Sequence, residues 1–293
     1  MTRLRVSASI VAAALLLGTS SGIARQTPAP YTDFHFYSEA LGRDMPYRVL
    51  APARNRGADG GADTARLPVL YLLHGLGGTF SDWSTRTRLA EHAAESGVLI
   101  VMPEGANSWY VNWHEGDRER WEDYIVRDLV AEVDARFPTD TRREARFIAG
   151  LSMGGYGALR MALAHPETYA LAASLSGAFD VARRETYGWD DDMRAAFLRT
   201  FGPGGSEVRR TTDLLTLAER VAPNGLPFLY IDCGADDPFL PVNRQFVETL
   251  QRRGIPYEYR ETPGRHDWRY WDRQVVQVLR VLEATAFVSP ADR

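Results

Sequence analysis

Apolar and polar residues alternate along the chain in a way that predicts an α/β architecture. Short, continuous apolar runs bounded by Gly, Pro and charged residues are typical of strands buried in a sheet. Longer segments with apolar residues three and four positions apart indicate helices that pack one face against such a sheet. The runs that predict strands are residues 35–40, 47–51, 67–73, 98–102, 146–149, 170–175, 227–232 and 257–261. The segments that predict helices are residues 86–96, 121–137, 156–164, 242–252 and 268–286.

The order of these segments predicts how the sheet is built. From residue 67 onward, strands alternate with helices, which indicates a mostly parallel sheet with helices on both faces. The first two strands have no helix between them, so we expect an antiparallel lead-in. Residues 178–225 contain no run typical of a strand and are interpreted as an insertion with short helices. Because there is no internal repeat and no second apolar core, residues 25–293 are predicted to form a single domain.

The first 24 residues differ from the rest of the chain. Arg3 and Arg5 precede an apolar run over residues 6–17, and small residues follow as far as Ala24. This order is typical of a secretory signal, and the apolar run is too short to span a bilayer comfortably. We therefore expect cleavage near Ala24, a mature chain that starts around Arg25, and a periplasmic or extracellular location. An uncleaved membrane anchor is the alternative.

Composition and charge argue against several kinds of partner. The 293 residues are 45% hydrophobic and 25% charged, and the formal net charge is −4. Without a basic surplus, the chain has no general attraction for nucleic acid or for an anionic membrane. No stable membrane anchor is expected, and the oligomeric state is left open. The single cysteine, Cys233, cannot form an internal disulfide, and its apolar run predicts a buried, unreactive strand position.

The sequence Gly150-Leu151-Ser152-Met153-Gly154 carries the clearest chemical signal. It matches the pattern G-x-S-x-G of the α/β-hydrolase fold, and it stands between a predicted strand and a predicted helix. Such a turn is sharp and strains the backbone at the serine, and flanking glycines let strand and helix approach closely. The hydroxyl then projects at the carboxyl edge of the sheet, near free N–H groups of the helix. Ser152 is therefore the candidate nucleophile, and a serine that only caps the helix is the alternative.

A nucleophilic serine needs a base, for which histidine is the leading candidate. In α/β-hydrolases the order along the chain is nucleophile, acid, histidine, and only His165 and His266 follow Ser152. His165 lies at a predicted helix end before Pro166, where an interaction with the helix dipole explains it. His266 lies in a loop between the last predicted strand and the last predicted helix, so it is the candidate base.

The acid that orients the histidine should follow a strand between Ser152 and His266. Asp232 lies within the predicted strand itself, whereas Asp236 and Asp237 lie just past its end. Either of the latter two could hold the imidazole and stabilise its protonated form. We favour Asp237 and keep Asp236 as the alternative, with the remaining acid capping the loop.

Acyl transfer also needs backbone donors for the oxyanion. One should be the N–H of Met153, directly after the nucleophile. The second should come from the loop after the third strand, whose sequence is HGLGG at residues 74–78. Glycines let that backbone fold over the site, and Leu76 is the predicted donor. His74 itself is interpreted as structural.

Aromatic residues are candidates for the substrate cleft. Several of the seven tryptophans gather in residues 109–121 and 268–271. Rings of this kind stack on sugars and on aromatic acids, so we expect Trp109, Trp113 and Trp268 to line the cleft. Packing in the core is the alternative for each of them. No pair of histidines or cysteines has the spacing of metal ligands, so neither a metal site nor a cofactor is predicted.

Four segments together resemble the esterase family of α/β-hydrolases that includes esterase D (S-formylglutathione hydrolase), feruloyl and acetylxylan esterases and the secreted mycolyltransferases. They are residues 67–78 (LPVLYLLHGLGG), 147–163 (FIAGLSMGGYGALRMAL), 230–240 (YIDCGADDPFL) and 263–271 (PGRHDWRYW), and they span most of the expected mature chain. The resemblance implies Ser152 as nucleophile and His266 as base. It also implies, as the acid, the third residue after the strand-end glycine, which is Asp237, and oxyanion donors at Leu76 and Met153.

The leading hypothesis is a secreted serine carboxylesterase that acts on acyl or feruloyl esters of carbohydrates or small alcohols. Acyl transfer of the mycolyltransferase type would use the same residues and differs in whether a hydroxyl group outcompetes water. S-formylglutathione hydrolysis fits export less well, because glutathione detoxification is mainly cytosolic. The intact Ser152, Asp237 and His266 disfavour a non-catalytic glycan-binding module. The resemblance is poorest in residues 178–225, where family members differ, so the sequence leaves the substrate open.

Overall fold

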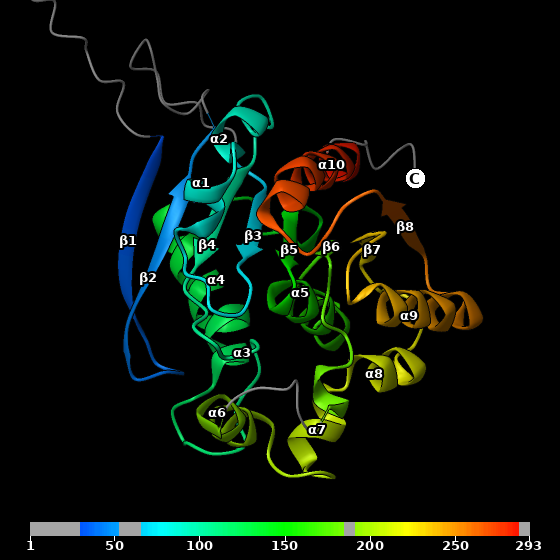
Figure 1. Cartoon of the computed structure of the whole chain (residues 1–293). Coiled ribbons are helices and arrows are strands. Elements are labelled where there is room, and N and C mark those ends of the chain that lie inside the picture. The colour runs from blue at the N-terminus through cyan, green and yellow to red at the C-terminus, as the bar shows by residue number, and fades with distance from the viewer. Residues whose placement is uncertain (1–29, 53–65, 185–190, 287–293) are drawn as a thin grey trace, which may run out of the picture.

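Eight strands form one sheet within the described residues, which are 30–52, 66–184 and 191–286 of a computed structural model (Figure 1). The strands follow the order β1-β2-β4-β3-β5-β6-β7-β8 across the sheet. Their bounds are β1 Tyr31–Ser38, β2 Arg43–Leu50, β3 Val69–Leu73, β4 Leu99–Pro103, β5 Arg146–Leu151, β6 Leu171–Leu175, β7 Phe228–Gly234 and β8 Tyr257–Thr262.

The strand directions confirm the predicted sheet. β1 pairs antiparallel with β2, and β2 pairs antiparallel with β4. From β4 to β8 every neighbouring pair is parallel. Parallel strands are joined by helical crossovers, which cover both faces of such a sheet. The protein therefore has the α/β-hydrolase fold, with two antiparallel strands leading into a parallel sheet.

Helices pack against both faces of the sheet (Figure 1). Neighbouring residues of β3 point to opposite faces: Tyr71 packs in one apolar cluster with Tyr124, and Leu72 packs in the other with Val275. Helices α4, α5 and α9 contribute to the first cluster, and α1, α2 and α10 contribute to the second. The helix bounds are α1 Asp82–Arg86, α2 Leu89–His92, α3 Trp121–Asp123, η2 Tyr124–Leu129, α4 Val130–Arg136, η3 Arg143–Ala145, α5 Met153–Ala164, η4 Val181–Arg183, α6 Asp191–Phe201, α7 Glu207–Thr212, α8 Leu214–Arg220, α9 Leu240–Arg253 and α10 Trp268–Ala286.

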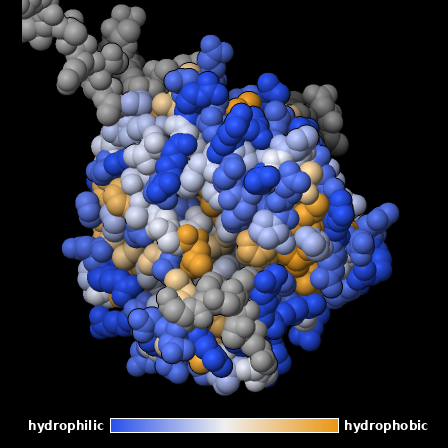
Figure 2. Space-filling view, in the orientation of Figure 1, coloured by the Kyte–Doolittle hydropathy of each residue, from blue (hydrophilic) through white to orange (hydrophobic). Residues whose placement is uncertain are grey.

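The stretch at residues 178–225 is made of short helices where it is described. It contains η4, α6, α7 and α8, and no strand occurs among its described residues. Figure 1 shows α6 and α7 at the lower end of the molecule, with α10 at the upper end. In the same view the surface is largely hydrophilic, with apolar residues in small, separate groups (Figure 2).

The single helix predicted at residues 86–96 is wrong, because two short helices, α1 and α2, replace it. Thr87, between them, has an extended backbone, and its hydroxyl donates a hydrogen bond to the carbonyl of Trp83. The N–H of Arg88 donates to Oδ1 of Asp272 at 2.8 Å. A carboxylate of α10 therefore caps the start of α2, which is a contact that no local pattern predicts.

The expected signal segment, residues 1–24, lies outside the described residues. Among the helices that the structure describes, none is both long enough and apolar enough to cross a membrane. The described part of the chain begins with β1 at the edge of the sheet, as Figure 1 shows.

Cys233 is buried, as its position in an apolar run predicts. Its side chain in β7 has an exposed fraction of 0%. Burial, together with the nearby charge of Asp237, raises the pKa of its thiol well above the usual range. The thiol is therefore protonated and unreactive in the folded protein.

β5 and α5 meet in a sharp turn at Ser152. The serine has φ 52° and ψ −115°, a conformation that residues with a side chain rarely adopt. A Cβ on Gly150 would lie 2.4 Å from the carbonyl carbon of Gly154, and a Cβ on Gly154 would lie 2.6 Å from the carbonyl oxygen of His74. Only glycine fits at these two positions, so the close approach of strand, helix and the next loop is built into the sequence.

We expect Gly150→Ala to destabilise the fold more than Gly254→Ala does. The methyl group at position 150 would overlap backbone that can move only if the β5–α5 turn opens, at a cost of about 2–3 kcal/mol or more. Gly254 ends α9 with φ 64°, and no described atom lies within 4 Å of a Cβ built there. Alanine at position 254 should therefore cost only about 1 kcal/mol, through its backbone conformation. Urea unfolding measures both losses, and equal losses would contradict the prediction.

Candidate active site

Three side chains from separate loops meet at the carboxyl edge of the parallel sheet, where ligands bind in open α/β folds. Ser152 stands at the β5–α5 turn, Asp237 lies in the loop after β7, and His266 lies in the loop between β8 and α10. The Nε2 atom of His266 lies 3.0 Å from Oγ of Ser152, and its Nδ1 atom lies 2.9 Å from Oδ2 of Asp237. The structure thus brings together the three residues that the sequence predicts as nucleophile, base and acid.

The two neighbouring acids of the β7 loop occupy different environments. The side chain of Asp237 is fully buried, and its Oδ1 accepts the N–H of Phe239 at 2.8 Å while its Oδ2 faces His266. The side chain of Asp236 is exposed, and its backbone N–H donates to the carbonyl of Gly264 at 2.9 Å. Asp237 is therefore the carboxylate that contacts the histidine, and Asp236 ties the two loops together through its backbone.

Aromatic rings hold the imidazole of His266 in place. Phe239 and Trp271 pack edge-on against it, with centroid distances of 5.0 and 4.9 Å. The indole N–H of Trp271 donates to Oγ of Ser176 at 3.1 Å, which fixes that ring in turn. About 25% of the His266 side chain is exposed. The imidazole is therefore fixed on its packed sides and open on one side, toward solvent.

The loop after β3 is fixed by hydrogen bonds from the segment after β4. The N–H of Gly105 donates to Nε2 of His74 at 2.8 Å, so we place the ring proton on Nδ1, which lies 2.8 Å from the carbonyl of Gly75. The N–H of Gly77 donates to Oδ1 of Asn107 at 2.7 Å. Both nitrogens of His74 are thus used in backbone contacts, which is a structural arrangement.

Two backbone N–H groups beside Ser152 make no hydrogen bond to the described residues. In the loop after β3, two glycine N–H groups are used, one within the loop and one by Asn107. The N–H groups of Leu76 and Met153 have no acceptor among the described residues. These are the two groups that the sequence predicts as oxyanion donors.

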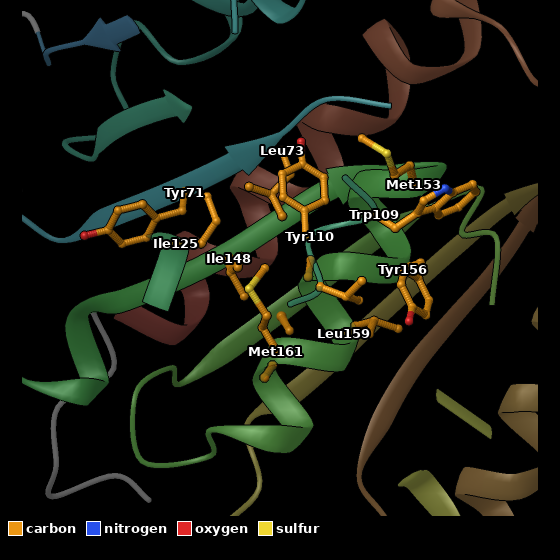
Figure 3. Packing of buried hydrophobic residues seen from close by; sticks show 14 of the residues in the cluster. Tyr71, Leu73, Trp109, Tyr110, Ile125, Ile148, Met153, Tyr156, Leu159 and Met161 are labelled. Atoms are coloured by element: carbon orange, nitrogen blue, oxygen red, sulfur yellow. The ribbon is translucent and has the colours of Figure 1, made fainter. Parts of the chain in front are cut away.

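A pocket of about 220 Å³ opens at Ser152. Of the three tryptophans predicted for the cleft, Trp268 lines this pocket. Trp109 is only 4% exposed and packs against Tyr156, and Figure 3 shows its ring beside Met153 and Tyr156 of α5. Trp113 lines a separate pocket beside α3 and α7. The described lining of the Ser152 pocket is Gly75, Leu76, Gly77, Gly78, Asp82, Arg86, Leu151, Ser152, His266, Trp268 and Trp271.

Two residues of this lining, Asp82 and Arg86 of α1, were not predicted from the sequence. Trp271 belongs to the tryptophans of residues 268–271 that the sequence offers for the cleft, and it lines the pocket together with Trp268. Asp82 and Arg86 of α1 lie in a polar stretch that carries no chemical signal. The guanidinium of Arg86 lies 5.6 Å from the ring centroid of Trp268 and 3.6 Å from the carboxylate of Asp82. One wall of the pocket therefore consists of an ion pair whose guanidinium lies over the indole ring of Trp268.

The other histidine that follows Ser152 in the chain lies in a different network. The Nε2 atom of His165 is 2.8 Å from Oε1 of Glu122, whose other oxygen is 2.8 Å from Arg160. Burial tends to raise the pKa of Glu122, but the guanidinium of Arg160 and the hydrogen bond from His165 outweigh it and hold the pKa near 2. His165 is thus engaged away from the nucleophile. Among the described residues, no group of three His, Cys, Asp or Glu is placed to hold a metal ion.

Comparison with known proteins relates this arrangement to one family. The sequence profile of the family described as "Putative esterase" matches residues 38–282. The chain belongs to this esterase family. The match covers strands β2 to β8 and all three residues of the Ser152, Asp237 and His266 cluster.

Individual relatives are similar over most of the chain. The acetyl esterase of Caldicellulosiruptor saccharolyticus is 30% identical over 255 residues, which cover 84% of this chain and 95% of the relative. The diacylglycerol acyltransferase/mycolyltransferase Ag85A of Mycobacterium tuberculosis is 26% identical over 315 residues, which cover 94% and 88%. Among solved structures, FphF, a fluorophosphonate-binding serine hydrolase of Staphylococcus aureus, is 28% identical with a TM-score of 0.76, covering 88% of this chain and 99% of its own. The protein is a carboxylesterase-type serine hydrolase.

A second buried carboxylate of this esterase supports the loop that carries His266. Asp232 of β7 is fully buried and accepts hydrogen bonds from the hydroxyls of Tyr270 and Tyr230. Burial raises its pKa to about 6, although the two hydroxyl hydrogen bonds oppose the shift. The hydroxyl of Tyr270 also lies 3.0 Å from Oγ1 of Thr262. Asp232 thus holds the Tyr270 side chain, and Tyr270 in turn joins the start of α10 to the end of β8, on both sides of the loop.

We expect Asp232→Asn to become more stable relative to the wild type as the pH rises. The native state holds the Asp232 proton more tightly than the unfolded chain, so this carboxyl stabilises the esterase most below about pH 4. That contribution is lost as the pH rises through about 6, where the buried group ionises. Between pH 5 and pH 8 the stability difference should shift toward the variant by about 1–2 kcal/mol.

Urea unfolding of both proteins at pH 5 and pH 8 measures this shift. Asp236→Asn is the matched control, because it replaces an exposed carboxylate of the loop that directly follows β7. A stability difference between Asp232→Asn and the wild type that is constant across this pH range would show that Asp232 is already ionised at pH 5 in the folded protein.

Proposed function

We propose that the protein hydrolyses carboxylic esters through a triad of Ser152, His266 and Asp237 and a covalent acyl-enzyme. The observation that supports this most directly is the position of His266, whose two ring nitrogens lie within hydrogen-bond distance of Ser152 Oγ and Asp237 Oδ2. Asp237 accepts a hydrogen bond from the Nδ1–H group, which leaves the unprotonated Nε2 to act as a base toward the hydroxyl. The relation to a fluorophosphonate-binding serine hydrolase agrees with a serine nucleophile.

The reaction proceeds in two steps, formation of the acyl-enzyme and its hydrolysis. Oγ of Ser152 attacks the ester carbonyl carbon while Nε2 of His266 takes the hydroxyl proton, and the carbonyl electron pair moves onto oxygen. Collapse of this intermediate expels the alkoxide, which takes the proton from His266 and leaves as an alcohol. Water then attacks the acyl carbon and gives a proton to His266. The second collapse releases the carboxylic acid and returns the proton to Ser152.

Two backbone groups would stabilise the oxyanion in both steps. The N–H groups of Leu76 and Met153 flank Ser152 and have no acceptor among the described residues, so they can turn to a developing negative charge. Met153 is the first residue of α5, whose N-terminal end favours negative charge. Leu76 is held by its neighbour Gly77, whose N–H is bonded to Asn107.

The pocket indicates which esters would fit. Its volume of about 220 Å³ lies below the usual range of small-molecule sites. One wall is formed by the ion pair of Arg86 and Asp82, with the guanidinium of Arg86 over the indole ring of Trp268. A short acyl group such as acetyl would fit beside Ser152. A larger group such as feruloyl would have to extend over Trp268, on which its ring could stack. The alcohol part would then be a carbohydrate or a small alcohol outside the pocket.

Acyl transfer is the second candidate, because Ag85A of Mycobacterium tuberculosis, a diacylglycerol acyltransferase/mycolyltransferase, is a relative of this chain. It would use the same nucleophile, base and acid, with a sugar hydroxyl in place of water in the second step. Product analysis with added trehalose or another polyol separates the two, because transfer gives an acylated polyol and hydrolysis gives only the free acid.

We also propose that the esterase acts outside the cytoplasm. Residues 1–24 have the charged start, apolar run and small-residue end of a secretory signal. The N-terminal sequence of the protein recovered from the periplasm or medium tests this, and a start near Arg25 is the expected result. A chain that starts at Met1 in that fraction would contradict removal of the signal.

We expect Ser152→Ala to lower p-nitrophenyl acetate turnover by at least about a thousandfold, because the nucleophile is removed. The fold should stay intact, because alanine is smaller than serine and the Ser152 hydroxyl makes no capping hydrogen bond to α5. Turnover is followed by absorbance, and the urea midpoint checks the fold. Wild-type turnover in the variant would show that the nucleophile lies elsewhere.

Two neighbouring carboxylates provide the control for this experiment. Asp237→Asn leaves the imidazole without its buried anionic partner and should reduce kcat steeply, whereas Asp236→Asn changes an exposed side chain. If the two variants lose activity equally, the distinction between the two acids is wrong.

We expect Asn107→Ala to reduce kcat about tenfold with little change in KM, because the loop that carries Leu76 loses its acceptor for Gly77 and the oxyanion donor is less well placed. Asn107→Asp replaces the amide oxygen with a carboxylate oxygen that can still accept the Gly77 N–H, so it should restore much of the rate. Steady-state kinetics with p-nitrophenyl acetate measure both variants. An unchanged kcat in Asn107→Ala would show that this bond does not position the donor.

A further inference from the structure

A second pocket, of about 410 Å³, opens within the stretch at residues 178–225. It lies between η4, the loop before α7, and helices α7 and α8. Its lining carries Arg183, Arg209, Arg210 and Arg220, with Asp213 as its described carboxylate. The whole chain has a formal net charge of −4, so the charge of this arginine cluster is opposite in sign to that of the chain. Such a concave, basic site attracts anions.

The carboxylate in the pocket is already fully used. Oδ1 of Asp213 accepts the N–H groups of Leu215 and Thr216 at 3.1 and 3.4 Å, which caps α8. Its Oδ2 accepts the Thr216 hydroxyl at 2.6 Å and Nε of Arg183 at 2.7 Å. Asp213 therefore pairs with Arg183, and the described lining holds no second carboxylate for Arg210 and Arg220.

Two exposed arginines provide free donors. Arg220 makes no ion pair or side-chain hydrogen bond with the described residues, and Arg210 donates to the carbonyl of Gly205. The neighbouring acid Glu219 is engaged elsewhere, in an ion pair with Arg252. A planar guanidinium binds a carboxylate through two parallel hydrogen bonds, so such arginines suit carboxylate groups.

A buried arginine gives the pocket a fixed wall. Arg209 is only 6% exposed. Its Nε donates to the carbonyl of Gly202 at 2.9 Å, and its Nη1 donates to the carbonyls of Ala182 and Arg184 at 3.2 and 2.7 Å. These bonds join α7 to η4 and to the loop between α6 and α7. The hydrogen bonds of Arg209 therefore fix the relative positions of the segments that line the pocket.

The pocket is linked to the catalytic residues by a short piece of chain. The N–H of Ala178 donates to the carbonyl of Ser152 at 3.3 Å. Five residues further on, Arg183 lines the pocket, so at most about 18 Å of extended chain separates the two. Next to it, the guanidinium of Arg184 lies 5.9 Å from the ring of Phe239, which packs against His266 at 5.0 Å.

We propose that this pocket binds carboxylate groups of an acidic carbohydrate chain whose ester group is attacked at Ser152. The inference rests on the proposed esterase function and adds a substrate class to it, namely esters of uronate-containing oligosaccharides or polysaccharides. One uronate occupies the pocket through Arg210 and Arg220, and the chain runs past η4 to present its ester at Ser152. The small pocket at Ser152 then selects the acyl group, and the basic pocket selects the polymer.

The kinetic test compares a substrate that reaches both pockets with one that reaches only the first. In Arg210→Gln/Arg220→Gln, the KM for an acetylated oligogalacturonide should rise at least about tenfold, because two charge-assisted contacts are lost. The KM and kcat for p-nitrophenyl acetate, and for an acetylated neutral xylo-oligosaccharide, should stay unchanged. Arg118→Gln/Arg280→Gln is the matched control, since it removes the same charge from exposed positions outside the pocket.

A binding test separates failure of this proposal from failure of the proposed function. Ser152→Ala protein titrated with unesterified polygalacturonate should bind it, and adding the Arg210→Gln/Arg220→Gln pair should abolish binding, whether or not the protein hydrolyses any ester. Inorganic phosphate and duplex DNA at the same concentration of negative charge are the comparison ligands. The proposal is overturned if either binds as tightly as polygalacturonate, if the pair leaves binding intact, or if the KM for the acidic substrate does not change. The urea midpoint of the pair confirms that it folds.

Discussion

The close contact between Gly150 of β5 and Gly154 of α5 is the constraint on which the site depends. It turns the chain so sharply that Ser152 takes a backbone conformation rarely open to a residue with a side chain. The same contact sets Gly154 against the carbonyl of His74, so the loop after β3 cannot shift without moving the nucleophile. One tight turn thus places the hydroxyl, the start of α5 and the neighbouring loop together, before any substrate is present.

Features governed by local pattern could be predicted from the sequence. The strands at residues 67–73 and 98–102 are continuous apolar runs because helices cover both faces of the sheet, and every residue of β3 and β4 is buried. Ser152 and His266 stood out for a different reason, since turn chemistry and the order of residues along an α/β-hydrolase chain leave few choices. The structure places these two side chains within hydrogen-bond distance of each other.

Features set by contacts between distant segments could not be predicted in this way. The break between α1 and α2 involves Asp272 of α10, which local periodicity does not include. Asp236 and Asp237 are adjacent, and only the course of the β7 loop decides which side chain turns inward. Trp109 and Trp268 look equally suited to a cleft in the sequence, but packing puts the first in the core and the second beside Ser152.

The burial of Cys233 has a practical consequence for studying this molecule. It is the only thiol in the chain, and it sits in β7, the strand that leads to Asp237 and contains Asp232. A thiol reagent can reach it only when the sheet opens around β7, so its rate of modification reports how often that region unfolds. The chain therefore contains a natural probe of the opening of its own interior, placed in the strand that supports the triad acid.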